Sequence, residues 1–127
     1  MSVEAGVSPS ESAAKVAAAI ANVVGVDVAE VSMSDSRAKF SSDDPGSLNR
    51  FREQLRARRV RSAARAALYR GKAGASATLL LNRQAAAVGV VAVCGEPEES
   101  PLGPIVVRIG SEKLDEVIEW LTSQEPR

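Results

Sequence analysis

The spacing of apolar positions predicts an amphipathic helix near the start of the chain. Apolar residues recur every three or four positions from Ala13 to Val24, which gives this segment one apolar face. The preceding letters SPSE, residues 8–11, are a helix-start signal, because a serine able to cap the helix is followed by proline and then by a glutamate that closes a capping box. Glycine commonly follows the last turn of a helix, so we expect the helix to end at Gly25.

Six other stretches have the length and apolar pattern of strands. They are residues 1–7, 26–33, 37–42, 75–82, 85–93 and 104–109. The fourth and fifth flank the letters NRQA, so we expect them to form a hairpin that turns there. Gly89 interrupts the fifth and indicates a bulge or a close approach of backbone. Helical spacing returns in residues 111–123, with Ser111 as a cap.

Residues 48–70, between the third and fourth of these stretches, are expected to be helical, but they cannot form one straight helix. Apolar residues from Leu48 to Leu55 point in one direction on a helical wheel, and those from Val60 to Leu68 point in a direction rotated by about 160°. One helix cannot present both sets to one core. We therefore expect a bend near the letters RARR, residues 56–59, between a short helix and a longer one.

The order of these elements indicates an α+β fold with an antiparallel sheet and helices mainly on one face. With 127 residues, of which 45% are apolar, the chain fits one domain over residues 1–127, with residues 124–127 as a tail. No run approaches the roughly 18 apolar residues of a membrane span, and the first residues lack the pattern of a signal peptide. We expect a soluble, cytoplasmic protein that is not bound to a membrane.

Charge is concentrated in the bent helical segment. Residues 49–72 hold nine of the 16 Lys and Arg side chains and a single acid, Glu53, although the formal net charge of the chain is zero. On the second helix Arg58, Arg61 and Arg65 form a row roughly opposite the apolar face, with Tyr69 at its edge. Three further cations lie to the side of this row: Arg59, Arg70 and Lys72.

Such a row suits the phosphates of a nucleic acid. Guanidinium groups are always charged and donate in a planar fork, and a tyrosine ring can stack on an unpaired base. Two alternatives stay open. Arginines on a solvated helix face often only keep it soluble. Acids elsewhere, such as Glu116 or Glu119, could pair with the helix and cancel its field, and Tyr69 could simply pack at the helix edge.

The residue types that the chain lacks exclude most catalytic sites. It has no histidine, and Cys94 is its single cysteine, so no catalytic triad, intrachain disulfide or thiolate zinc site can form within it. Glu96, Glu98 and Glu99 either hold magnesium or, as such clusters more often do, form a solvated turn. We therefore expect no catalytic residues, no metal and no cofactor.

Segments that together span nearly the whole chain resemble an uncharacterised family of small archaeal proteins, generally described as predicted RNA-binding proteins. The most specific of the matching letters are LNRQAA followed by a glycine, and SPLGPI. The resemblance implies a fold similar to that of ribosomal protein L-five: a two-layer α+β domain with a curved, mostly antiparallel sheet and helices packed on one face. It also matches Arg59 and Arg65 to the arginines of the family motif, and Arg83 to the basic position of LNRQAA.

Residues and resemblance together lead us to expect a non-enzymatic protein that contacts RNA phosphates through a basic helix. The side chains expected at the interface are Arg58, Arg61 and Arg65, with Arg59, Arg70, Lys72, Arg83 and Tyr69 around them. At a hairpin turn Arg83 would project freely toward a phosphate, or it would be a turn residue with no partner. The alternative function is a protein-interaction or assembly module, such as a homodimer, whose arginines meet an acidic partner.

Overall fold

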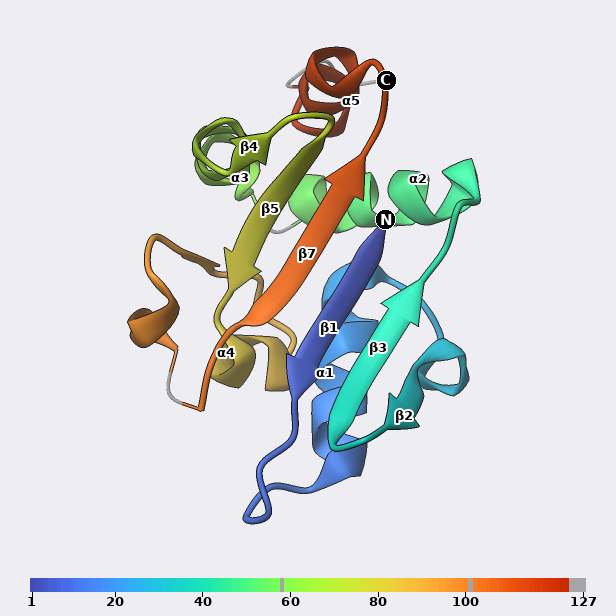
Figure 1. Ribbon diagram of the computed structural model, residues 1–127, viewed down its shortest axis with the longest axis vertical. Coiled ribbons are helices and arrows are strands. Elements are labelled where there is room, and N and C mark those ends of the chain that lie inside the picture. Colours follow the sequence, from blue (N-terminus) through green and yellow to red (C-terminus); the bar gives the residue numbers. More distant parts are fainter. Residues whose placement is uncertain (58, 101, 124–127) are drawn as a thin grey trace.

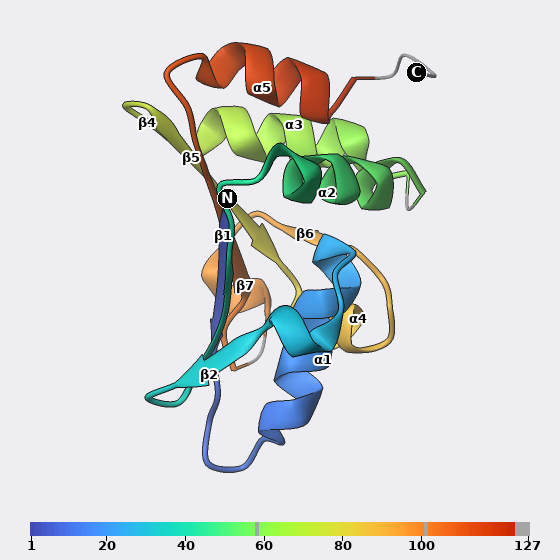
Figure 2. The ribbon, with the colours of Figure 1, turned by 90° about the vertical axis from the view of Figure 1, so that its right-hand side faces the viewer.

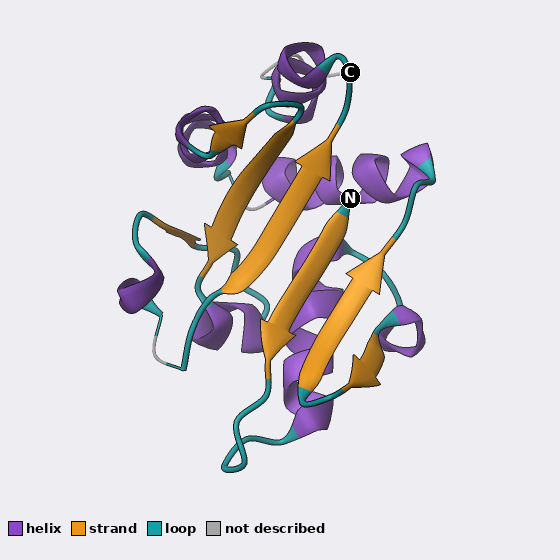
Figure 3. Cartoon of the chain, in the orientation of Figure 1, coloured by secondary structure: helices purple, strands orange, loops and turns teal. Residues whose placement is uncertain are grey.

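An antiparallel sheet runs through the molecule (Figures 1 and 3). The computed structural model describes residues 1–57, 59–100 and 102–123. In this part of the chain seven strands form one sheet in the order β2-β3-β1-β7-β5-β4, and β6 pairs with β5. All neighbouring strands are antiparallel. The strands are β1 (Ser2–Gly6), β2 (Ser32–Ser34), β3 (Arg37–Ser41), β4 (Lys72–Ala73), β5 (Ser76–Leu81), β6 (Val93–Cys94) and β7 (Ile105–Gly110).

Five α-helices in the described part of the chain cover one face of this sheet, as the edge-on view in Figure 2 shows. They are α1 (Ala13–Val24), α2 (Pro45–Ala57), α3 (Arg61–Arg70), α4 (Arg83–Ala87) and α5 (Leu114–Leu121). Two short 3-10 helices, Val28–Glu30 and Pro97–Glu99, lie in connections. The expected α+β fold with an antiparallel sheet is confirmed. The tail expected at residues 124–127 lies outside the described residues.

The core lies between the sheet and the helices. Buried side chains alternate with more exposed ones along β1, β3, β5 and β7, so that one face of each strand packs against helices. Large side chains that are fully buried come from both layers: Val3, Leu79, Leu81, Ile105 and Ile109 from strands, and Ile20, Phe51, Leu55, Leu68 and Ile118 from helices. Burying one such side chain contributes about 1.5–3 kcal/mol to the stability of the folded state, so this core holds the sheet and the helices together.

The bend expected near residues 56–59 is confirmed, because α2 and α3 are separate helices. The expected order of lengths is wrong, since α2 has 13 residues and α3 has 10. Phe51 and Leu55 on α2 and Ala64 and Leu68 on α3 are all buried in the same core. Two helices can point these two sets inward, whereas one straight helix would turn one of them toward solvent.

A pair of backbone hydrogen bonds makes the bend. The N–H of Val60 donates to the carbonyl of Leu55, and the N–H of Arg59 donates to the carbonyl of Arg56, both at 3.2 Å. This pattern ends many helices and places one residue in the left-handed conformation, usually glycine. Here Arg59 takes that position, with a φ of 58°.

The expected hairpin turn at NRQA is wrong, because these letters begin helix α4. The side chain of Asn82 accepts a hydrogen bond from the N–H of Ala85 at 2.9 Å and so caps the helix. At the other end Gly89, with a φ of 81°, and Val90 donate their N–H groups back to carbonyls of α4. Gly89 therefore follows a helix and does not interrupt a strand. Of the strand expected over residues 85–93, only Val93 is extended, in β6, which pairs with β5.

Three other boundaries differ from expectation. Ser111 does not cap the last helix, because α5 begins at Leu114 and its N-cap is Lys113, which makes no side-chain cap hydrogen bond. Most of residues 26–33 is not a strand, because Asp27 and Glu30 form a capping box that starts a 3-10 helix and leaves only β2 extended. The cap of α1 is Ser12, beyond the SPSE letters, and its end at Gly25, with a φ of 83°, is as expected. Short capping motifs of this kind override the apolar alternation around them.

Candidate nucleic-acid interface

The side of α3 that carries Arg61 and Arg65 meets the C-terminal helix α5. Arg61 is half-buried, and its Nη1 donates to the backbone carbonyl of Ser123 at 2.8 Å. Nη2 of Arg65 lies 2.6 Å from Oε2 of Glu119. The two arginines share one side of α3, but this side does not form a free row, because α5 and the residues after it supply acceptors to both. Arg58, which was expected to continue the row, lies outside the described residues.

Tyr69 lies among these charges at the edge of α3. Its hydroxyl donates to the same Oε2 of Glu119 at 2.5 Å, and this hydrogen bond is the main reason that the pKa of Tyr69 is raised above its ordinary value of 10. The guanidinium carbon of Arg65 is 5.8 Å from the ring centroid, and Nζ of Lys72 is 5.7 Å from it. The ring is thus engaged with cations of its own chain. A base would have to displace one of them in order to stack there.

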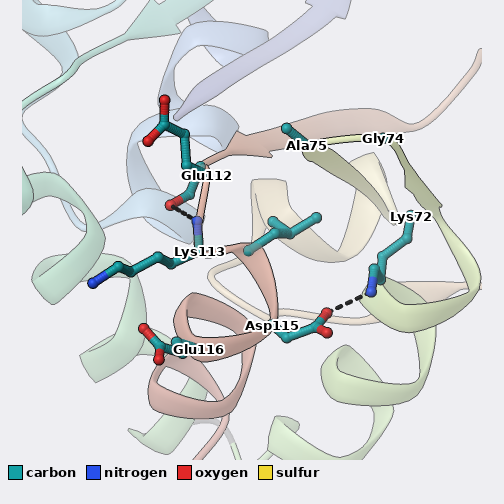
Figure 4. Close-up of a pocket in the computed structure, with 9 residues that line it drawn as sticks. Lys72, Gly74, Ala75, Glu112, Lys113, Asp115 and Glu116 are labelled. Carbon is teal, nitrogen blue, oxygen red and sulfur yellow. Dashed lines mark hydrogen bonds and ion pairs between the residues drawn. The ribbon is translucent and has the colours of Figure 1, made fainter.

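Lys72 is also engaged with α5, through an ion pair with Asp115. In Figure 4 the two side chains point toward one another and meet at the border of a shallow cavity of about 400 Å³, which Glu112, Lys113 and Glu116 also line. Positive and negative groups are mixed here, so the cavity has no strong field of one sign. Among the described residues no group of three or more His, Cys, Asp or Glu side chains could hold a metal ion.

Three other arginines of the helical segment are more accessible, whereas Arg52 on α2 is buried and its Nε donates to the carbonyl of Trp120 at 2.9 Å. Arg50 on α2, Arg59 just before α3 and Arg70 at the end of α3 are exposed, and their side chains have no hydrogen bond or ion pair within the described residues. The side chain of Arg65 is 48% exposed despite its pair with Glu119. We call Arg50, Arg59, Arg65 and Arg70 the helix-side arginines. Arg59, Arg65 and Arg70 belong to the expected interface and are within reach of a ligand, and Arg50 was not expected there.

Arg83 does not project freely from a turn, and it is not a turn residue without a partner, so both expectations for its position are wrong. It is 5% exposed, because it lies at the first position of α4 and turns into the protein. Its Nη1 donates to the carbonyl of Gly6 at 2.6 Å and to both carboxylate oxygens of Glu11 at 2.9 and 3.0 Å. Its Nε donates to the carbonyl of Gly103 at 2.8 Å. Arg83 therefore ties the start of α4 to two connections of the fold, the one between β1 and α1 and the one that leads into β7.

This arrangement lowers the pKa of the Glu11 carboxyl group. Burial by itself would raise the pKa of Glu11, but the backbone N–H of Ser8 and the guanidinium of Arg83 stabilise the charged form and lower its pKa below 4.5. A buried charge that is paired and hydrogen-bonded in this way is a structural clamp. It leaves no charge over for a ligand.

A second group of cations, which the sequence patterns did not single out, lies on the face of the sheet away from the helices. Arg37 and Lys39 on β3 and Arg108 on β7 are exposed, and they surround Glu4 on β1. Nη2 of Arg37 lies 3.1 Å from Oε1 of Glu4, and Nη1 of Arg108 lies 3.3 Å from the same oxygen. The alternation of charged and apolar letters in RAKF was the signal, since it puts both cations opposite Ala38 and Phe40.

Comparison with known proteins places the chain among archaeal relatives. No family model matches it. It is 36% identical to a protein of Metallosphaera sedula over 126 residues, which cover 98% of this chain and 88% of the relative, and that protein is described as a UPF0201 protein. The chain belongs to the UPF0201 family. A UPF0201 protein of Aeropyrum pernix is also 36% identical, over 95% of this chain and 83% of its own length.

Solved structures of UPF0201 proteins have the same fold. One uncharacterised member, 27% identical, superposes with a TM-score of 0.75 over 97% of this chain and 92% of its own. A protein of Archaeoglobus fulgidus, described under family DUF54, is 19% identical and superposes with a TM-score of 0.74 over 98% of this chain and 95% of its own, which shows the fold alone. No helix in the described part of this UPF0201 chain is long and apolar enough to cross a membrane.

Proposed function

We propose that this protein is a non-enzymatic, cytoplasmic RNA-binding protein that holds phosphates through the helix-side arginines. The observation that carries the proposal is the concentration of nine of 16 basic residues in the segment of α2, α3 and β4, of which Arg50, Arg59 and Arg70 are exposed without a partner in the described residues. Planar guanidinium forks suit phosphate oxygens, and their charge does not depend on pH.

The acidic side chains of α5 reduce the positive charge of this surface, but they do not prevent a ligand from reaching it. Arg65 and Glu119 are each about half exposed, at 48% and 47%, and exposed ion pairs are worth about 1 kcal/mol or less. A phosphate can therefore replace Glu119 as the partner of Arg65. Arg61, which donates to a backbone carbonyl, and the buried Arg83 are not part of the proposed surface.

We also propose that the fold is of the kind found in ribosomal protein L-five. This likeness supports RNA as the ligand class only by analogy, because one fold hosts many functions. The charges on this chain supply the independent argument. With four aromatic residues in the chain, extensive base stacking is not available, so the proposed mode is contact with backbone and shape.

The proposal is tested by the affinity of the purified protein for a fluorescein-labelled RNA hairpin, measured by fluorescence anisotropy. The salt concentration is varied over roughly 50–200 mM, a range in which phosphate contacts weaken measurably. The variant Arg59→Glu/Arg70→Glu is compared with Lys15→Glu/Lys113→Glu, which reverses the same amount of charge at exposed sites elsewhere. We expect at least about a tenfold loss for the first pair, a smaller loss for the second, and a lower salt slope for the first.

Two results would overturn the proposal. One is the absence of RNA binding by the unaltered protein at low salt. The other is an equal loss for both variants, which would mean that only the net charge matters. An acidic protein partner is the competing function, and a polyglutamate peptide that binds as tightly as the RNA hairpin and loses affinity in the same variant would favour it.

A further inference from the structure

The face of the sheet opposite the helices carries no α-helix in the described part of the chain (Figure 2). All five α-helices lie on the other side (Figure 2). The alternation along the strands therefore points every second side chain of β1, β3, β5 and β7 outward. We call this surface the open sheet face. Its central side chains are Glu4, Arg37, Lys39, Thr78, Leu80, Val106 and Arg108.

Strand register brings three cations of this face around one acid. Lys39 lies directly opposite Glu4 across β3 and β1, and Arg108 lies opposite Ser2 across β1 and β7. Arg37 and Arg108 both reach Oε1 of Glu4, yet their side chains stay 49% and 54% exposed. Lys39 has no hydrogen-bonding or ionic partner among the described residues that would satisfy its ammonium group. The cluster thus keeps more positive than negative charge.

The charge decides what can cover this face. Two copies of the protein meeting through it would bring like charges together, which opposes association. An apolar partner would meet only the half-buried side chains of Leu80 and Val106. A polyanion fits, because each guanidinium can exchange its shared bond to Glu4 for a phosphate oxygen. Phe40, the aromatic residue of β3, points into the core, so it offers no stacking surface here.

We propose that the open sheet face is a second RNA-contacting surface, on which Arg37, Lys39 and Arg108 hold phosphates and Glu4 limits their affinity. The ligand class rests on the proposed function, but the surface does not: it lies on the opposite side of the sheet from α2 and α3 (Figure 2). Arg70 and the open-face residues Thr78 and Leu80 line one cavity of about 200 Å³, so the two surfaces meet at the edge of β5 and one RNA segment can reach both there.

The test uses charge changes of opposite sign on this one face. Lys39→Gln/Arg108→Gln is compared with Lys15→Gln/Lys113→Gln, which removes two exposed charges elsewhere, and with Glu4→Gln. The probe is the same labelled RNA hairpin at low salt. We expect about a tenfold weaker affinity for Lys39→Gln/Arg108→Gln, a salt slope lower by about two, and a several-fold tighter affinity for Glu4→Gln. Thermal melts monitored by circular dichroism confirm that each variant is folded.

The outcomes separate this inference from the proposed function. If the unaltered protein binds RNA but the sheet variants behave like the Lys15/Lys113 control, the inference is overturned and the proposed function stands. If the Lys39/Arg108 variant weakens binding while Arg59→Glu/Arg70→Glu does not, the inference stands and the helix-side surface fails. No RNA binding by any form overturns both. If a polyglutamate peptide binds the unaltered protein as tightly as the RNA hairpin and loses affinity equally in Lys39→Gln/Arg108→Gln, the ligand of the open sheet face is an acidic protein and the inference is overturned.

Discussion

Arg65 and Glu119 join α3 to α5 through an ion pair of 2.6 Å, and the hydroxyl of Tyr69 donates to the same carboxylate oxygen. An acid from the last helix thus holds two of the side chains that the sequence marked for RNA. Because the pair is half exposed, Glu119 acts on the binding surface mainly by competing for Arg65, and it contributes little to the stability of the fold.

The first prediction concerns Glu119→Gln. This change should free Arg65 and tighten the binding of the RNA hairpin several-fold, since a competing anion is lost. It should also lower the pKa of Tyr69 toward 10, because the hydrogen bond to Glu119 is the main cause of the raised value. Tyr69 is the single tyrosine of the chain, so its ultraviolet titration reports on this group without interference. Glu116→Gln, one turn away on α5, is the matched control.

The sign of the alkaline effect follows from the same shift. The pKa of Tyr69 in the folded protein is higher than its ordinary value, so its contribution to stability is fully present below pH 10 and is lost as the pH rises through the folded pKa. Urea unfolding should therefore show a free energy that falls more steeply above pH 10 in the unaltered protein than in Glu119→Gln. Parallel curves would contradict the link between the two residues.

A second prediction concerns the buried pair of Arg83 and Glu11. Arg83→Met leaves the carboxylate of Glu11 buried without its cation, and we expect a loss of about 3–5 kcal/mol in the free energy of unfolding. Arg83→Met/Glu11→Met removes both charges and should lose less than the two single changes together. Urea denaturation of the three variants measures the coupling, and additive losses would show that the pair is not a unit.

The acid dependence of this pair also has a definite sign. The pKa of Glu11 is below 4.5 in the folded protein, so its contribution is present above the unfolded pKa and is lost as the pH falls through the folded one. The unaltered protein should lose stability below about pH 4.5, and Glu11→Gln should lose less over the same interval. Glu4 has a lowered pKa as well, so a residual acid dependence is expected in this variant.

A third prediction concerns the bend between α2 and α3. Arg59 has a φ of 58°, which costs a residue with a Cβ about 1–2 kcal/mol, whereas glycine adopts it freely. Glycine also gains freedom in the unfolded chain, so the net effect of Arg59→Gly should be a gain of about 0.5–1 kcal/mol. Arg59→Ala keeps the Cβ and should give no gain. A loss of stability in Arg59→Gly would show that its side chain matters more than its backbone.

A fourth prediction concerns the contact between α3 and β5. A Cβ added to Gly71 would lie 2.2 Å from the carbonyl oxygen of Thr78, and backbone cannot move away as a side chain can. Gly71→Ala should therefore cost about 1–3 kcal/mol or more. Gly110→Ala is the control, because its Cβ would lie 3.7 Å from the nearest atom, the carbonyl oxygen of Ala75. Thermal melts of the two variants should differ clearly in midpoint.

Much of the fold was determined by local patterns in the sequence. Helical spacing from Ala13 and a glycine at position 25 are enough to specify α1 and its end, since both act within a few residues. The division of the basic segment into α2 and α3 follows from the rotation of its apolar positions, whatever the rest of the chain does. The alternation in RAKF likewise assigns its charged letters to one face of a strand.

The helix at NRQAAAVG was also encoded locally, but by its capping residues and not by the spacing of its apolar residues. Asn82, three residues before Ala85, caps the start of α4, and Gly89 adopts a positive φ just after the helix ends. The apolar run after it has the pattern of a strand, and periodicity alone does not separate a short buried helix from a strand in such a run. This is why Arg83 was expected at an exposed turn and is instead buried.

Only the tertiary structure decided which charges meet. Glu119 lies 50 positions from Tyr69 and Glu11 lies 72 positions from Arg83, and the register of β1 with β3 and β7 brings Glu4 between Arg37 and Arg108. A sequence pattern determines which face of an element is apolar, because that depends on neighbours within one or two turns. It does not determine which polar faces lie together, because that depends on how the apolar faces pack around a common core.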